Sequence, residues 1–300
     1  MGIVGLASGS VIARGAMRGA FVCVLALFPV AASAAWLPGT FMAKALARVI
    51  AAQRESSLKA DYGWDRGVCL MGALLKPGES LGVSRTLRAG ESYLFVAGGS
   101  DGATGLTLSL LNSQGMCVAQ DARGKATSVV TYSPASTELF SIRIRSRAAS
   151  QPGFCALGLF REHGTRVHAD HVATTAAELI ARSSRLAERA RGARFSQEPK
   201  QWALFGTIMQ PGDTQTIPLR GAGRARHAIL AAGDGNARNL DLFLLDASGR
   251  SRRKNSQPSA HPFLVYETRK GCSYRLRWRN TESRGASLVI TAILDIGIDG

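Results

Sequence analysis

The chain has 300 residues, of which 46% are hydrophobic and 19% charged, and its formal net charge is +16. This composition is typical of a globular protein and excludes an intrinsically disordered one, and the length suits two domains. The positive charge favours polyanionic partners such as anionic lipid, acidic polysaccharide or nucleic acid. The alternative is that arginines spread over the whole chain serve general solubility.

Residues 1–34 are predicted to be an export signal. Two arginines precede an apolar run over residues 20–30, and the small residues at 32–34 fit a signal-peptidase cleavage site. The apolar run is short for a membrane span, so we expect cleavage rather than a retained anchor. The mature chain is then secreted or periplasmic in a bacterium, with no transmembrane span after signal cleavage.

The rest of the chain is one unit repeated. Residues 43–161 align with residues 177–295 at a constant offset of 134, without a gap, which places Pro77 on Pro211. A duplication of this kind indicates two equivalent domains. It also provides an internal control, because residues needed for a shared reaction should occur in both copies, and few candidate catalytic groups do.

Each copy opens with a helical segment. In the N-terminal segment, residues 35–63, apolar side chains recur at helical spacing over residues 42–50. The linker, residues 163–197, shows the same period over residues 172–190. We expect both helices to pack against the β-domains, and a helix on a membrane surface is the alternative for the second because it is rich in arginine.

After each helix, polar and apolar residues alternate as in β-strands. This pattern predicts one β-sandwich at residues 64–162 and a second at residues 198–296. Strands are expected in copy 1 near 67–75, 81–88, 91–98, 105–112, 116–120, 127–133, 138–146 and 153–160. Strands are expected in copy 2 near 201–209, 214–220, 225–232, 239–246, 249–253, 261–267, 272–280 and 286–294. We therefore predict a mainly β fold of two tandem jelly-roll-like antiparallel β-sandwiches, each preceded by an α-helix.

The seventh predicted strand of each copy alternates arginines with apolar residues. These arginine rows comprise Arg143, Arg145, Arg275, Arg277 and Arg279. Successive side chains of a strand face opposite sides of a sheet, so we expect the arginines on the outer face. They are a candidate site for the phosphate or sulfate groups of a polyanion, and an ordinary solvated face is the alternative.

Export permits disulfides among the cysteines that remain after signal cleavage. These are Cys69, Cys117, Cys155 and Cys272. Three full pairings are open, and Cys69 with Cys155 is preferred because the first and last strands of a sandwich are often neighbours. The chain has no C-x-x-C sequence, which argues against a zinc site made of thiolates.

Copy 2 has a Gly-Asp pair at residues 233–234, the sequence N-L-D-L-F-L-L-D-A-S-G at 239–249 and Y-R-L-R-W at 274–278. These segments resemble the bacterial pre-peptidase C-terminal (PPC) domain. That family shows a G-D segment, a D-L-D-L-x-L-x-D-x-x-G hairpin and a closing Y-x-L-R-V strand. Copy 1 is similar to the family's L-x-A-G-x-x-Y-x-F pattern at residues 87–95 but has Thr107 where copy 2 has Asp241. The resemblance covers roughly 85 residues in each copy, on the scale of one small sandwich.

The resemblance implies an exported jelly-roll-like sandwich that acts as an accessory module. Family members accompany secreted hydrolases and assist secretion, solubility or substrate binding, and some relatives bind calcium. No peptidase domain accompanies the two copies in this sequence.

Two sets of residues are candidate metal ligands. The only histidine cluster comprises His163, His168, Asp170 and His171, and imidazoles beside a carboxylate suit a transition metal. Asp170 also fits the beginning of a helix. The candidate calcium ligands are Asp234, Asp241 and Asp246. They are hard oxygen donors near turns, but aspartate also caps its own backbone at bends.

We expect a non-enzymatic protein with a binding or envelope-scaffolding role. We expect no cofactor, with bound calcium as the alternative, and the sequence has no dedicated nucleic-acid motif. Its partner would be an envelope or extracellular polyanion, or a secreted protein. The competing hypothesis is a secreted hydrolase, or an accessory subunit of a secreted peptidase, that uses the histidine segment or Ser80. Ser80 lies in a G-x-S-x-G string, which needs a strand–turn–helix to expose the nucleophile.

Overall fold

The two copies fold with the same connectivity in a computed structural model of the chain. The structure describes residues 37–297 apart from 104, 148–150, 191, 199, 222–223 and 270, so the predicted signal at 1–34 lies outside the described residues. The helices of the described part are α1 (Thr40–Ser57) and α2 (Ala169–Arg189), and each precedes one set of strands. Neither is long and apolar enough to cross a bilayer.

The strands confirm the predicted fold class, which is mainly β. Copy 1 contains β2 (Val68–Leu75), β3 (Ser80–Leu87), β4 (Tyr93–Gly99), β5 (Leu106–Leu111), β6 (Cys117–Asp121), β7 (Thr127–Tyr132), β8 (Glu138–Ser146) and β9 (Gly153–Glu162). Copy 2 contains β11 (Leu204–Met209), β12 (Thr214–Arg220), β13 (Arg226–Gly233), β14 (Ala237–Asp246), β15 (Ser251–Asn255), β16 (Phe263–Glu267), β17 (Ser273–Ser283) and β18 (Ser287–Ile296). Two further strands, β1 (Tyr62–Trp64) and β10 (Arg194–Phe195), are too short to show a period in the sequence.

Strands of both copies join in one ten-stranded sheet. Its order is β16-β13-β18-β11-β2-β9-β4-β7, and β1 and β10 pair with β9 and β18. The other strands form one four-stranded sheet in each copy, β3-β8-β5-β6 and β12-β17-β14-β15. Each strand of copy 1 therefore has its counterpart at the same place in copy 2. The two copies share a topology but are not separate bodies, because the described residues of both belong to a single compact unit.

The antiparallel pairing of β2 with β11 joins the copies. The facing pairs are Leu70 with Gly206, Met71 with Phe205, and Gly72 with Leu204. At the offset of 134, Leu70, Met71 and Gly72 correspond to Leu204, Phe205 and Gly206. The leucine of each copy therefore faces the glycine of the other copy, and Met71 faces its own counterpart. The same short segment of the unit therefore meets itself, as in the interface of a two-fold symmetric homodimer.

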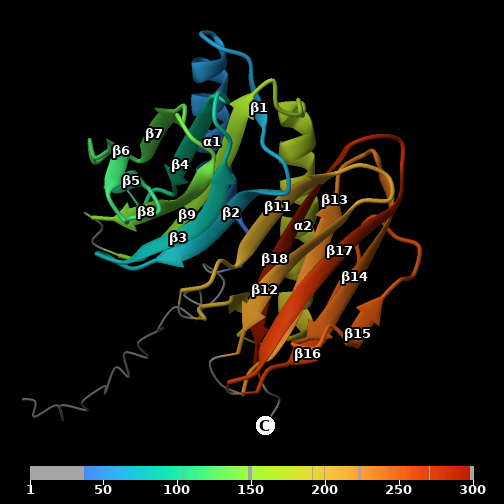
Figure 1. Cartoon of the computed structure of the whole chain (residues 1–300). Coiled ribbons are helices and arrows are strands. Elements are labelled where there is room, and N and C mark those ends of the chain that lie inside the picture. The colour runs from blue at the N-terminus through green and yellow to red at the C-terminus, as the bar shows by residue number, and fades with distance from the viewer. Residues whose placement is uncertain are drawn as a thin grey trace, which may run out of the picture. The chain divides into compact units, whose positions relative to one another are not determined.

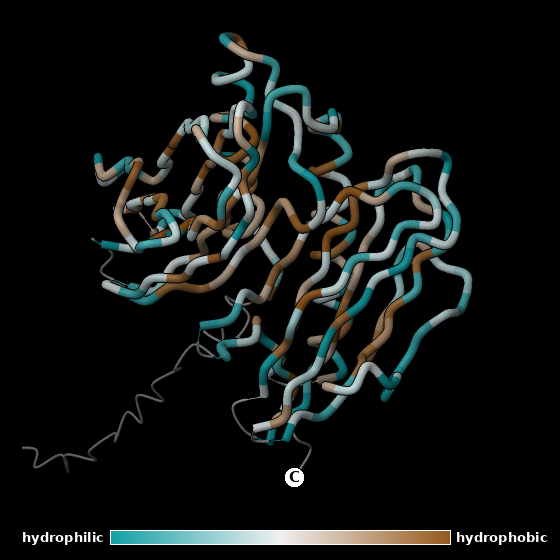
Figure 2. Tube along the Cα trace, viewed as in Figure 1, coloured by the Kyte–Doolittle hydropathy of each residue, from teal (hydrophilic) through white to brown (hydrophobic). Residues whose placement is uncertain are grey.

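The ten-stranded sheet is the middle layer of the fold (Figure 1). Helix α1 contacts β4 and β9, helix α2 contacts β13 and β18, and the four-stranded sheets pack on the opposite face. Strands covered on both sides, such as β4 and β9, are nearly continuous apolar runs. The outer strands β8 and β17 alternate between buried and exposed residues instead. In Figure 2, hydrophobic residues lie along many of the strands, and hydrophilic residues predominate at the turns.

Aromatic side chains connect the copies behind the sheet junction. Phe41 of α1 lies 5.7 Å from Phe154 of β9, measured between ring centroids, and Phe154 lies 5.0 Å from Phe195 of β10. Phe195 belongs to the segment that leads into copy 2, and it is fully buried. The helix of one copy and the entry segment of the other thus share one core.

The cysteines of the described residues are free thiols, so the predicted Cys69–Cys155 disulfide does not form. Strands β2 and β9 are neighbours, as expected, but their register places Cys155 opposite Ala73 rather than Cys69. Burial raises the pKa of both thiols to about 12. They therefore remain protonated and pack as small apolar residues of the core.

The junction predicts a strong effect of added volume at Gly206. A Cβ at this position would lie 2.8 Å from the Cβ of Leu70. We expect Gly206→Val to lower the free energy of unfolding by about 1–3 kcal/mol through overpacking, measured by urea denaturation. A Cβ at Gly235 would meet nothing within 4 Å, so Gly235→Val is the control and should cost less than about 1 kcal/mol. Equal losses in the two variants would contradict the tight junction.

Candidate functional site

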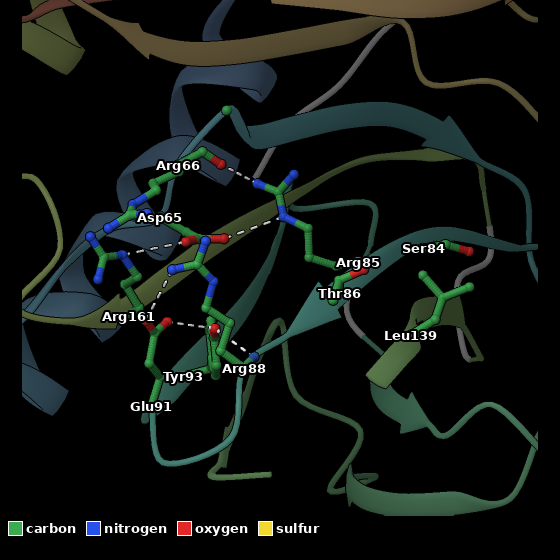
Figure 3. A pocket seen from close by; sticks show the side chains of 11 residues that line it. Asp65, Arg66, Ser84, Arg85, Thr86, Arg88, Glu91, Tyr93, Leu139 and Arg161 are labelled. Carbon is green, nitrogen blue, oxygen red and sulfur yellow. Dashed lines mark hydrogen bonds and ion pairs between the residues drawn. The ribbon is translucent and has the colours of Figure 1, made fainter. Parts of the chain in front are cut away.

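An arginine-rich pocket of about 450 Å³ lies in copy 1 (Figure 3). Its charged lining residues are Asp65, Arg66, Arg85, Arg88, Glu91 and Arg161. Polar and apolar side chains complete the wall, among them Ser84, Thr86, Tyr93 and Leu139. Arginine stays charged at every physiological pH, so four arginines against two carboxylates leave two positive charges in excess.

Strand pairing brings the parts of the pocket together. Arg161 of β9 lies opposite Gly63 of β1 on one side and opposite Tyr93 of β4 on the other. Directly after β1, the backbone amide of Asp65 donates to the carbonyl of Leu159 at 3.0 Å. The short strand β1 therefore delivers Asp65 to the side chain of Arg161.

Asp65 holds two guanidinium groups. The Nε of Arg85 donates to one carboxylate oxygen at 3.3 Å, and the Nε of Arg161 lies 3.6 Å from the other. Arg85 also donates to the carbonyl of Arg66 and, at 3.0 Å, to that of Val68. The Nε of Arg161 is buried without a hydrogen-bond partner among the described residues. One carboxylate cannot neutralise two arginines, so this trio keeps a net positive charge.

A second set of contacts fixes the turn between β3 and β4. The hydroxyl of Tyr93 donates to the Glu91 carboxylate at 2.7 Å and accepts from the backbone amide of Arg88 at 3.0 Å. The guanidinium of Arg88 lies 3.9 Å from Glu91. Burial, followed by the hydrogen bond to Glu91, raises the pKa of Tyr93 to about 12, so the phenol stays protonated.

This arrangement suits a small molecule that carries an oxyanion. Figure 3 shows the guanidinium groups of Arg85, Arg88 and Arg161 around Asp65, with Arg66 on the same side as Arg161. Arg66 is exposed and forms no ion pair in the described part of the chain. Planar guanidinium groups bind carboxylate, phosphate and sulfate oxygens through paired N–H groups. The volume falls in the range of small-molecule sites.

The equivalent place in copy 2 has fewer positive charges, because among the four arginines only Arg66 has a cationic counterpart there, Lys200. The counterparts of Arg85, Arg161 and Tyr93 are Leu219, Asp295 and His227. His227 is buried, and its Nδ1 lies 2.9 Å from Asp295 while its Nε2 lies 3.1 Å from the Thr268 hydroxyl. Buried side chains thus fill this part of copy 2, and the arginine pocket is a property of copy 1.

The predicted arginine rows lie where the alternation places them. Arg143 and Arg145 of β8 and Arg275 and Arg279 of β17 are exposed on the outer faces, and Arg277 is half-buried. Arg275 donates to the carbonyl of Ala247 at 2.6 Å and so supports the turn between β14 and β15. The orientation of the rows is confirmed, but they lie on open sheet faces and do not line the pocket.

The predicted transition-metal cluster is not brought together. His163 lies 3.8 Å from Asp61, His168 lies 3.1 Å from Asp170, and His171 lies 2.9 Å from Asp234. His168 precedes α2 and accepts from the backbone amide of Asp170, so it caps the helix. Within the described residues no group of three metal-ligating side chains exists. Each histidine has a different carboxylate partner, and the proposed four-residue site is corrected accordingly.

The predicted calcium ligands serve the backbone and its turns. Asp234 accepts from the amides of Asn236 and Leu288 in addition to its contact with His171. Asp246 accepts from the Ser248 hydroxyl, which together with nearby Arg252 lowers the pKa of its carboxyl. Asp241 accepts from the hydroxyl of Thr281. Asp241 and Asp246 are about 16 Å apart along one strand, so the three carboxylates do not converge on one ion.

Ser80 does not sit in a nucleophile elbow. It begins β3 directly after the turn that follows β2. The elbow requires a helix after the serine, whereas here a strand follows. The geometry that the hydrolase hypothesis needs at Ser80 is therefore missing.

Comparisons with known proteins give distant likenesses only. No family model matches the chain, and no curated protein matches it. The M60 catalytic domain with CBM51-1 and CBM51-2 domains of Clostridium perfringens ZmpB is 7% identical over 81% of this chain, with a TM-score of 0.25. This chain spans 38% of that protein. The resemblance to the PPC domain stays a prediction.

Two further solved structures are similar at the same level. The CBM22-1-CBM22-2 tandem domain of Paenibacillus barcinonensis Xyn10C is 10% identical, over 78% of this chain and 92% of that one, with a TM-score of 0.20. The major capsid protein P2 of bacteriophage PM2 is 11% identical, over 77% and 99%, with a TM-score of 0.21. No conclusion about ligands of this chain follows from likenesses at this level.

The pocket predicts that an added anion rescues the loss of Asp65. Asp65→Asn leaves Arg85 and Arg161 without their shared carboxylate, which should lower the free energy of unfolding by about 3 kcal/mol. Sulfate should then raise the melting temperature of Asp65→Asn more than that of the unaltered protein, because it replaces the missing charge. Thermal unfolding in sodium sulfate and in sodium chloride of equal ionic strength measures this effect.

Asp121→Asn is the matched control, because sulfate stabilises proteins in general. Asp121 is also nearly buried and pairs with Arg123 at 2.8 Å, but it lies outside the pocket. It should be destabilised and gain no extra rescue from sulfate. An equal gain in both variants would show that the pocket has no special affinity for the anion.

Proposed function

We propose that this chain is an exported, non-enzymatic binding protein made of two PPC-like β-sandwiches, whose first copy captures a small molecule carrying a doubly charged oxyanion. The single observation that carries the proposal is the pocket around Asp65, where arginines outnumber carboxylates by two. Two excess charges match a phosphate monoester, which is close to doubly ionised near neutral pH, and a dicarboxylate carries the same charge.

The pocket is prepared for its ligand rather than formed by it. Asp65 and two backbone carbonyls already hold Arg85, and Asp65 holds Arg161. Side chains held in place before binding lose little conformational entropy when the ligand arrives. Arg66 and Arg88 are exposed and complete the contact, so Arg85 and Arg161 form the floor of the site and the two exposed arginines form its rim.

Export and the absence of catalysis rest on the sequence. The signal at 1–34 supports a secreted or periplasmic location, and the PPC resemblance supports an accessory role beside secreted proteins. A binding role needs charge and shape but no nucleophile with an activating base, which agrees with the position of Ser80 at a strand start.

Removing the rim arginines should weaken capture without unfolding the protein. Arg66→Gln combined with Arg88→Gln leaves the pairs of Asp65 intact, so the melting temperature should stay within a few degrees of its original value. Affinity for inorganic sulfate or phosphate should fall at least about tenfold, because charge-assisted hydrogen bonds are lost. Isothermal titration calorimetry measures both anions.

The control is Arg143→Gln combined with Arg145→Gln, which removes the same charge from the outer face of copy 1. It should change the affinity less than threefold if the pocket is the site, a difference of about 0.6 kcal/mol. Equal losses in both double variants would show that binding depends on the net charge of the protein and not on the pocket. Galacturonate in place of sulfate tests whether a single carboxylate is enough.

A further inference from the structure

Copy 2 carries a second basic hollow, the copy 2 groove, which is lined by residues at or near the ends of β13, β14, β15, β16 and β17. It has a volume of about 1520 Å³. Its charged lining residues are Arg224, Arg226, Asp246, Arg252, Arg253, Glu267 and Arg269. Five arginines against two carboxylates leave three positive charges in excess.

Contacts within the groove leave several arginines available. Arg252 lies 3.0 Å from Asp246, which is the ion pair of this hairpin. Arg224, Arg253 and Arg269 are exposed and form no ion pair among the described residues. The excess charge is therefore presented to solvent inside the groove.

The duplication provides a comparison for these arginines. At the offset of 134, the counterparts of the five groove arginines are Gly90, Ser92, Val118, Ala119 and Ala135. All five are uncharged, so the repeat unit does not need arginine at these positions to fold. Arginines that serve only solubility would not gather at one hollow of one copy, and their gathering indicates a ligand.

We propose that the copy 2 groove binds a linear acidic polysaccharide, a polymer with repeating sulfate or carboxylate groups. The groove is larger than the 300–1,000 Å³ that is roughly usual for one small ligand, so several sugar units fit. The five arginines that line it can pair with several of the anionic groups that such a polymer repeats. This site is separate from the pocket of copy 1 and goes beyond the function proposed above.

The lining argues against the two other polyanions. Binding of single-stranded nucleic acid uses exposed aromatic rings on which bases stack, whereas Tyr266 is 4% exposed and Tyr274 is half-buried. A membrane surface is usually held by exposed apolar side chains inserted among the lipids. The large exposed apolar residues of the described part are Leu58, Met116, Val118 and Leu139, and none of them lines the groove.

The test replaces the three unpaired arginines together, as Arg224→Gln, Arg253→Gln and Arg269→Gln. Binding of fluorescent heparin oligosaccharide is measured by anisotropy at several salt concentrations. We expect at least a tenfold loss of affinity and a weaker dependence on salt, because fewer counterions are released. Thermal unfolding should be unchanged, since no ion pair of the fold is removed.

The control is Arg143→Gln, Arg145→Gln and Arg147→Gln, which removes three charges from copy 1 outside the groove. It should lower the affinity less than threefold, and equal losses in both triple variants would overturn the proposal. The proposal would be overturned in favour of nucleic acid if a single-stranded DNA oligonucleotide bound as tightly as heparin and its binding were lost in the groove variant. Sulfate binding in the pocket of copy 1 should survive the groove substitutions, which separates failure of this proposal from failure of the first.

Discussion

The pairing of β2 with β11 is the constraint on which the rest of the structure depends. Without it, each copy would end its larger sheet in an apolar strand with unpaired backbone groups, and such an edge promotes aggregation. The segments Val68–Leu75 and Leu204–Met209 are apolar over most of their length, as expected for central rather than edge strands. One copy alone would therefore leave an apolar sheet edge unpaired, and pairing with the equivalent strand of the second copy buries that edge. The leucine–glycine pairs on both sides of Met71 and Phe205 show how closely the two backbones approach.

Because this junction fixes the scaffold, the copies were free to diverge at other places. Copy 1 gathers four arginines around Asp65, where copy 2 has a buried histidine beside Asp295. Copy 2 gathers five arginines between the ends of its strands, where copy 1 has none at the equivalent positions. The two copies thus carry clusters of arginine at different points of the same topology. A duplicated scaffold with unlike sites is suited to hold two different anionic groups.

The alternation of β8 and β17 made the sheets and their outward arginines predictable, because a period of two leaves a clear trace in nine or eleven residues. The pocket left no such trace. Asp65 and Arg161 are far apart in the sequence and meet only because a three-residue strand, β1, pairs with the end of β9. The prediction of a metal site at the histidine cluster was wrong because closeness in sequence did not bring the side chains together. His163, His168 and His171 are close in sequence, but a turn and a helix start aim them at three different carboxylates. The available signal was the comparison of copies, in which Arg85 and Arg161 stand against Leu219 and Asp295.

That comparison also supports a functional rather than a structural origin of the pocket. Burying a carboxylate with two arginines is costly, and replacing such a group by apolar residues is often neutral or stabilising. Copy 2 demonstrates that this fold forms with Leu219 where copy 1 has Arg85, so the cluster is not required by the strands around it. Local features that a fold does not need, and that cost free energy, are expected at functional sites. The uncompensated charge beside Asp65 therefore supports the proposal that a ligand supplies the missing negative charge.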